Sequence, residues 1–200
     1  SPIVEACPTK NKEKAMSFLH SFYSWGQVLV VLLSTLFFSL IGLSHWRIVA
    51  CIWAAVPLLN AFYFMRVPIR KLLSEEEGLS LRALFSKKIF WVLILLMICA
   101  GAAELSMSQW ASAFAESGLN VSKTVGDLAG PCLFAVLMGC ARLFYGKFGE
   151  KVTLWKFMLA SGILCVISYL IDAFSGFVQL SVIGCGFCGL FVGILWQAVL

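Results

Sequence analysis

One carboxylate stands alone in a long apolar stretch of this chain. Glu104 is the only acidic or basic residue between Ile89 and Ala115, and a helix beginning at Ile89 would carry it about 22 Å along its axis at about 1.5 Å per residue. A charge at such a depth in a bilayer costs about 2.5–3.5 kcal/mol on insertion scales. We therefore expect Glu104 to face a cavity or a partner, or to be protonated and serve as a proton carrier. Alternatively, a neutral Glu104 only hydrogen-bonds a neighbouring helix.

Polar residues follow Glu104 along the same stretch. Ser108 comes four residues later and therefore lies on the same helical face. Gln109 and Trp110 come next, and this pair suits a sugar, because an amide can bond hydroxyl groups while a flat ring can cover the C–H face. Alternatively, Trp110 is an anchor at the membrane interface, where tryptophan is common. These residues are candidates for solute binding or proton coupling.

A second polar face precedes these residues in the chain. His20, Ser24 and Gln27 have the spacing i, i+4 and i+7, which places them on one side of a helix. His20 and Gln27 are therefore further candidates for contact with a solute or a proton. Alternatively, they hydrogen-bond neighbouring helices, as polar side chains often do in membranes.

Membrane-spanning helices must hold these side chains. Of the 200 residues, 61% are hydrophobic and 12% charged, whereas soluble domains average about 25% charged residues. This composition excludes a disordered chain and, without a basic face, a nucleic-acid binder. Six apolar stretches are long enough to span a bilayer, at about 17–43, 47–66, 89–115, 123–145, 154–173 and 176–200. The sequence therefore predicts an all-α integral membrane protein.

The basic residues divide unequally between the connections of these spans. When the connections are assigned alternately to two sides, 13 of the 15 Lys and Arg residues fall on one side, and Arg47 and Lys123 fall on the other. Connections rich in Lys and Arg stay in the cytoplasm. We therefore expect the N-terminal segment, the connection at 67–88 and the connection after the fourth span to be cytoplasmic. The predicted location is the plasma (inner) membrane of a bacterium, as a multi-pass protein.

The connection at 67–88 is the longest and provides the predicted domain boundary. It separates an N-terminal part at 1–66, with two spans, from a C-terminal part at 89–200, with four. Leu81, Leu84 and Phe85 share one helical face within it, so this piece either lies flat in the headgroup region or belongs to a solvated linker. Because the chain starts at Ser1 and its last five residues lie inside an apolar run, we expect it to be part of a longer protein.

Three local patterns resemble the major facilitator superfamily, whose members have two six-helix bundles joined by a cytoplasmic connection. Gly146, Glu150 and Lys151 match its signature loop, in which a glycine is followed after three residues by an acid and a base, although Thr153-Leu154 replace the Gly-Arg that completes the pattern. Ser1-Pro2 followed by residues 19–26 (LHSFYSWG) resembles the passage from the fourth to the fifth helix of fucose permease-like sugar/proton symporters. Residues 101–104 (GAAE) with Gln109-Trp110 resemble the seventh helix of that group.

The resemblance implies a mechanism. The six spans would be helices five to ten of a two-bundle (6+6) transporter fold, truncated at both ends, in a secondary transporter that moves a monosaccharide by proton symport through alternating access. Arg142, Gly146, Glu150 and Lys151 would form a cytoplasmic gate that opens during transport, although by charge alone this cluster reflects only topology. Important acids of the fucose permease-like group would lie outside this chain, so Glu104 alternatively binds sugar without carrying the proton.

Other functions compete with this interpretation. A non-sugar solute fits the same pattern, and a non-transporting sensor would keep the fold. An intramembrane enzyme would need a nucleophile–base pair or a metal cluster, and His20 and His45 are the only histidines, so we expect neither an enzyme nor a metal nor a cofactor. Cys185 and Cys188 form a CxxC pair in an apolar span, where we expect thiols to pack as small hydrophobes. The expected partners are a solute, a proton and membrane lipid, with no nucleic acid.

Overall fold

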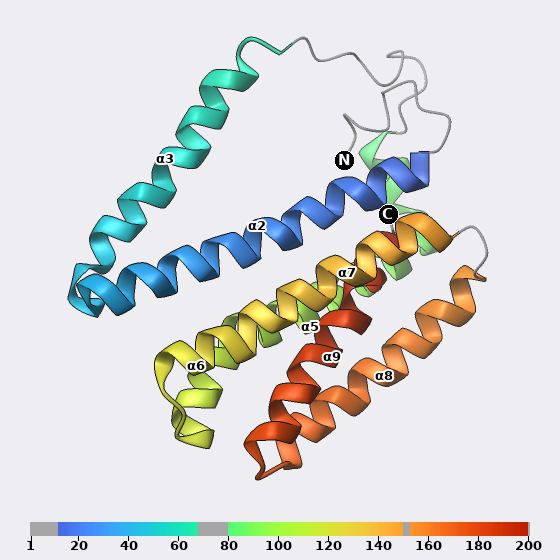
Figure 1. Cartoon of the computed structure of the whole chain (residues 1–200). Helices are drawn as coiled ribbons and strands as arrows, with labels where there is room; N and C mark the ends of the chain where they lie inside the picture. The colour runs from blue at the N-terminus through green and yellow to red at the C-terminus, as the bar shows by residue number, and fades with distance from the viewer. Residues whose placement is uncertain (1–11, 68–79, 150–152, 200) are drawn as a thin grey trace.

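The computed structural model describes residues 12–67, 80–149 and 153–199, and the elements within these ranges are all helical. In chain order they are α2 (Lys12–Ile41), the short η1 (Leu43–His45), α3 (Trp46–Phe64), α4 (Leu81–Phe85), α5 (Lys88–Leu119), α6 (Lys123–Asp127), the π-helical turn η2 (Leu128–Cys132), α7 (Leu133–Phe148), α8 (Leu154–Phe174) and α9 (Val178–Val199) (Figure 1).

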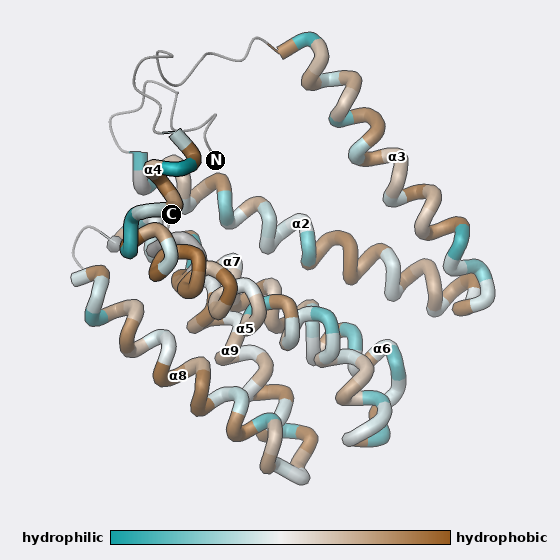
Figure 2. Tube along the Cα trace, turned by 180° about the vertical axis from the view of Figure 1, so that it is seen from behind, coloured by the Kyte–Doolittle hydropathy of each residue, from teal (hydrophilic) through white to brown (hydrophobic). Residues whose placement is uncertain are grey.

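Six helical segments of the described ranges are long and apolar enough to span a membrane. They are Lys14–Ile41, Leu43–Phe64, Lys88–Leu119, Lys123–Phe148, Leu154–Phe174 and Val178–Leu195. The fourth runs through α6, η2 and α7 without a break, although Pro131 lies inside it. Hydrophobic residues fill most of the length of these helices (Figure 2), and many large ones face outward, such as Leu40 and Phe174. The prediction of an all-α membrane protein with six spans is confirmed.

The core of the bundle lies where α7 and α9 cross. α2 packs on α7, whereas α8 and α5 pack on α9. α3 leaves this arrangement after Gly42, whose φ of 96° favours glycine at the turn (Figure 1). The indole N–H of Trp53 ties α3 back to α2 by donating to Ser34 Oγ at 2.9 Å.

Glycines on α9 allow its close approach to α7. A Cβ on Gly189 would overlap the backbone carbonyl of Phe134, and a Cβ on Gly193 would lie 3.0 Å from the carbonyl oxygen of Met138. Such contacts between backbones are typical of membrane helices with small residues at the interface. Gly189 and Gly193 therefore permit the backbones of α7 and α9 to pack closely. Cys188 and Cys185 are buried in the core beside this contact, where they pack with apolar side chains.

The two ends of the bundle differ in their connections. Three short turns, at 42–45, 120–122 and 175–177, lie at one end, called the distal end below (Figure 1). At the opposite end the connection expected at 67–88 includes residues 68–79, which lie outside the described residues. Its described part forms α4, and the ring of Phe85 packs edge-to-face on Phe90, with 5.3 Å between centroids. The domain boundary and the side of the membrane on which each end lies stay predictions.

Candidate functional site

A buried ion pair joins α5 to α7. Arg142 Nη2 lies 3.2 Å from Glu104 Oε2, and the two side chains are only 2% and 9% exposed. Two charges cannot be withdrawn from solvent in this way unless they are paired and hydrogen-bonded. Glu104 therefore faces a partner, as expected. That partner is Arg142, which was expected in the cytoplasmic gate.

The same guanidinium also binds α2 and α9. Its Nε donates to the backbone carbonyl of Gly193 at 3.1 Å, and Nη1 donates to the carbonyl of His20 at 3.1 Å and to Ser24 Oγ at 2.9 Å. The ring of Tyr23 lies 5.5 Å from the guanidinium carbon, within the range of a cation–π contact. One side chain thus connects four helices, and we call Glu104, Arg142 and Ser24 the central cluster.

The position of Arg142 follows from the packing of α7. Phe134 and Met138 precede Arg142 at intervals of four residues, and both are fully buried. Residues with this spacing share one helical face, so Arg142 continues the buried face instead of starting the connection after the helix. α7 ends at Phe148, six residues later. Arg142 was expected among the charges at the cytoplasmic end, but its side chain lies inside the bundle.

The other residues predicted from the sequence form no hydrogen bond to the side chain of Glu104 in the described ranges. Ser108 is turned toward its own helix and donates to the carbonyl of Leu105 at 3.4 Å. Gln109 and Trp110 on α5 are both exposed, and the exposed fraction of Trp110 is 67%. On α2, Gln27 Oε1 is buried without a hydrogen-bond partner among the described residues, and so is the Nε2 atom of His20.

Of the expected gate residues, Gly146 can be placed beside α2. A Cβ at this position would lie 3.2 Å from Ser17 Oγ, and Ser17 Oγ itself donates to the carbonyl of Arg142 at 2.7 Å. The glycine therefore permits close packing of α2 on α7 at this end. Glu150 and Lys151, the remaining two residues of the expected gate, lie outside the described residues.

A second polar network, not expected from the sequence, lies at the distal end. Lys123 Nζ lies 3.1 Å from Asp127 Oδ1 and 3.4 Å from Glu116 Oε1, while Thr35 Oγ1 donates to Asp127 Oδ2 at 3.1 Å. Ser112 also donates to Asp127. The spacing i, i+4 of Lys123 and Asp127 was a visible signal for part of this network, but its contact with α2 required the fold. The network holds α2, α5 and α6 together.

The central cluster can perform two kinds of chemistry. Within the described part of the chain no hydrogen bond reaches Glu104 Oε1, so this atom can accept a hydroxyl hydrogen or a proton. Protonation of Glu104 would remove the negative charge that faces Arg142 and weaken the link between α5 and α7. An arginine released in this way offers donors to a polar ligand. The geometry therefore suits coupling of a proton or a polar solute to helix movement.

The comparisons with known sequences are consistent with this architecture. A family model described as the Major Facilitator Superfamily matches residues 3–200. Neither the comparison with curated proteins nor that with solved structures found a match. Because the match extends over nearly the whole chain, and six spans are present in its described part, the chain belongs to the Major Facilitator Superfamily of secondary transporters.

Proposed function

We propose that the protein moves a monosaccharide across the plasma membrane of a bacterium by proton symport, through alternating access. Family membership supports secondary transport of some solute; the sugar and the proton rest on the residues of the site. The single observation that carries the proposal is the buried ion pair of Glu104 and Arg142 at the junction of four helices.

A coupled proton is suggested by the contacts of Arg142 with three neighbouring helices. Arg142 holds Glu104 of α5 on one side and backbone carbonyls of α2 and α9 on the other. A proton on Glu104 cancels the attraction across 3.2 Å, while the carbonyl contacts of Arg142 remain. Protonation therefore loosens α5 specifically, which couples a proton to movement of one helix against the others.

A sugar is suggested by unpaired polar atoms on α5 and α2. Glu104 Oε1, Gln27 Oε1 and His20 Nε2 have no hydrogen-bond partner in the described ranges. Buried polar atoms normally have partners, and the hydroxyl groups of a monosaccharide can both donate to and accept from such atoms. Gln109 and Trp110 of α5 remain candidates for contact with the solute.

The proposed gate and topology complete this mechanism. Gly146, Glu150 and Lys151 form the cytoplasmic gate, whereas Arg142 acts inside the bundle. The distal end then faces away from the cytoplasm. The parts at 1–66 and 89–200 belong to two bundles that rock against each other about the α2–α7 contact.

Uptake by the full-length protein in proteoliposomes tests this proposal. With an inward proton gradient, we expect one or more radiolabelled monosaccharides to accumulate, and Glu104→Gln to abolish the dependence of uptake on the gradient. Glu116→Gln is the matched control, because Glu116 is a partly exposed acid on the same helix, bonded to Lys123 instead of Arg142.

Two results would overturn separate parts of the proposal. If Glu104→Gln retained gradient-driven accumulation, Glu104 would not carry the coupled proton. The sugar assignment would be wrong if the protein accumulated no monosaccharide but did accumulate another solute, and if no monosaccharide inhibited that uptake. The family assignment would still stand.

A further inference from the structure

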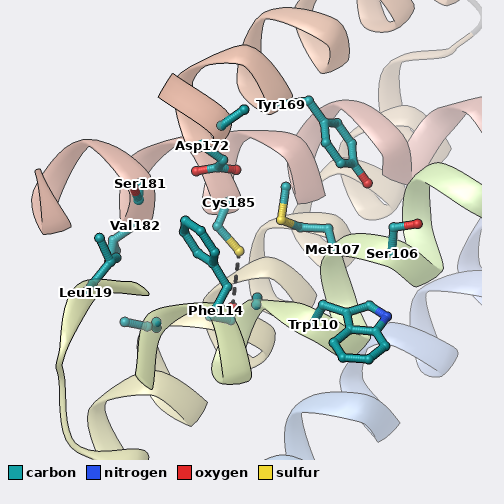
Figure 3. Close-up of a pocket in the computed structure, with 15 residues that line it drawn as sticks. Ser106, Met107, Trp110, Phe114, Leu119, Tyr169, Asp172, Ser181, Val182 and Cys185 are labelled. Carbon is teal, nitrogen blue, oxygen red and sulfur yellow. Dashed lines mark hydrogen bonds between the residues drawn. The ribbon is translucent and has the colours of Figure 1, made fainter. Parts of the chain in front are cut away.

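A cavity of about 260 Å³ lies near the distal end, away from the central cluster. Its walls come from α5, α8 and α9 (Figure 3), and Ala129 and Gly130 of η2 also line it. Glu104, Arg142 and Ser24 do not line it. The cavity is therefore separate from the central cluster, and Trp110 is the one candidate solute-contact residue among its described lining residues.

One wall of this cavity carries a carboxylate without a partner. Both oxygens of Asp172, in the last turn of α8, are buried and form no hydrogen bond with the described residues. Ser181 Oγ on α9 also lines the cavity and is likewise buried and unpaired. Figure 3 shows the two side chains on the same side of the cavity, above Phe114 and Cys185. A buried carboxylate of this kind needs a counter-charge or a hydrogen bond.

Gly184 of α9 makes room for the carboxylate. A Cβ at this position would lie only 2.6 Å from Asp172 Oδ1 and 3.1 Å from its Cγ. Any larger residue would displace the Asp172 side chain. The absence of a side chain at Gly184 therefore lets the carboxylate sit against α9, one turn of helix from Ser181.

The remaining walls are apolar and aromatic. Trp110, Phe114 and Tyr169 line the cavity together with Met107 and Ala111, and no basic residue of the described ranges does so. Aromatic rings attract cations through their faces, and most strongly when the cation is desolvated. One carboxylate, the unpaired hydroxyl of Ser181 and several rings around an apolar space match an ammonium group attached to a hydrocarbon body.

An inorganic cation fits this chemistry less well. Calcium prefers six to eight oxygen ligands and magnesium an octahedron of oxygens, but among the described residues the buried, unpaired side-chain oxygens at this cavity belong to Asp172 and Ser181. No group of three His, Cys, Asp or Glu side chains that could hold a metal occurs in the described ranges. The size is also suitable for an organic ligand, because an apolar cavity of roughly 150 Å³ is known to hold benzene.

We infer that this cavity is a binding site for a small organic cation, an alkyl- or arylammonium ion, whose charge is held by Asp172 and Ser181 and whose apolar body lies among the aromatic rings. This ligand is distinct from the sugar and the proton of the proposed function. The inference therefore holds or fails independently of the transport assay.

Isothermal titration of the purified full-length protein tests the inference, with benzylammonium as the probe and benzyl alcohol as its uncharged match. We expect benzylammonium to bind at least about tenfold more tightly, because a hydrogen bond to a charged group contributes that much. Asp172→Asn should abolish the preference for the charged probe. Gly184→Ala should weaken benzylammonium binding, because the new Cβ displaces the carboxylate. Glu116→Gln, which removes an acid outside the cavity, should leave binding unchanged.

Several outcomes would overturn the inference. These are no saturable binding of benzylammonium to the unmodified protein, equal binding of the two probes, and an unchanged preference in Asp172→Asn. Displacement of benzylammonium by sodium at equal concentration would also overturn it, because the occupant would then be an inorganic cation. If Asp172→Asn fails to fold, Ser181→Ala takes its place. This variant removes one hydrogen bond to the ammonium group, so it should weaken the binding of benzylammonium and leave the binding of benzyl alcohol unchanged. Unchanged binding of benzylammonium would contradict the inference.

Discussion

Breaking the ion pair between Glu104 and Arg142 should lower the free energy of unfolding, and the losses in the single and double variants should not be additive. The charges lie 3.2 Å apart, which corresponds to about 5 kcal/mol of attraction at an effective dielectric constant of about 20. Removing one member of a buried pair typically costs about 3–5 kcal/mol, because the other charge is left uncompensated. We therefore expect Glu104→Gln and Arg142→Gln each to lower the free energy of unfolding by about 3–5 kcal/mol.

The double variant Glu104→Gln/Arg142→Gln separates the pair from the other contacts of the arginine. Arg142→Gln also loses the hydrogen bonds to Gly193, His20 and Ser24, but these are lost equally in the single and the double variant. The double variant leaves no isolated charge. We therefore expect its loss of unfolding free energy to be about 2–3 kcal/mol smaller than the sum of the losses in the two single variants, near the upper end of the interaction energies of residues in contact.

Unfolding of the full-length protein in mixed detergent–SDS micelles, followed by circular dichroism, provides these free energies. Glu116→Gln again serves as the control, and its cost should stay below about 1 kcal/mol, as for a partly exposed ion pair. If the two single costs were additive within about 0.5 kcal/mol, as independent sites are, the pair would not exist in the protein. The interpretation of Arg142 as a residue of the bundle interior would then fail as well.

Two further predictions concern helix packing. Gly189→Ala places a Cβ against the carbonyl of Phe134, so we expect overpacking to lower the free energy of unfolding by at least about 1–3 kcal/mol. Gly162→Ala is the control, because no atom lies within 4 Å of its new Cβ. Equal unfolding midpoints for the two variants would contradict the observed α7–α9 contact. Thr35→Val removes the donor to Asp127 Oδ2 and should cost about 1 kcal/mol in the same unfolding assay, whereas an unchanged midpoint would show that this link between α2 and α6 is not formed.

Much of the fold was predictable because lipid imposes a strong constraint on each segment separately. A spanning helix must satisfy its own backbone and present about 20 apolar residues, so long runs with few or no charges revealed all six spans and most of their ends. The fifth span, for example, was expected at 154–173 and is observed at Leu154–Phe174. The main deviation is Arg142: a charge six residues before the end of α7 resembles a loop charge in sequence, and its burial depends on which face of α7 is covered.

Asp172 illustrates the same difficulty. In the sequence it ends an apolar run and resembles a boundary residue, but in the structure its oxygens are buried against Gly184 and reach a cavity. Nothing in the local pattern distinguishes an acid that faces water from one that faces a neighbouring helix. That distinction depends on the direction of the side chain around the helix axis relative to its neighbours.

The sequence by itself determined that Glu104 is a carboxylate within a span, because hydrophobicity and charge are properties of each residue and its close neighbours in the chain. Only the tertiary structure decided that its partner is Arg142, 38 residues away and on a different helix. Helix pairing depends on where small residues such as Gly189 and Gly193 let α9 approach α7, and on the buried face that this approach creates. The chemistry of the site therefore follows from composition, whereas its connections follow from packing.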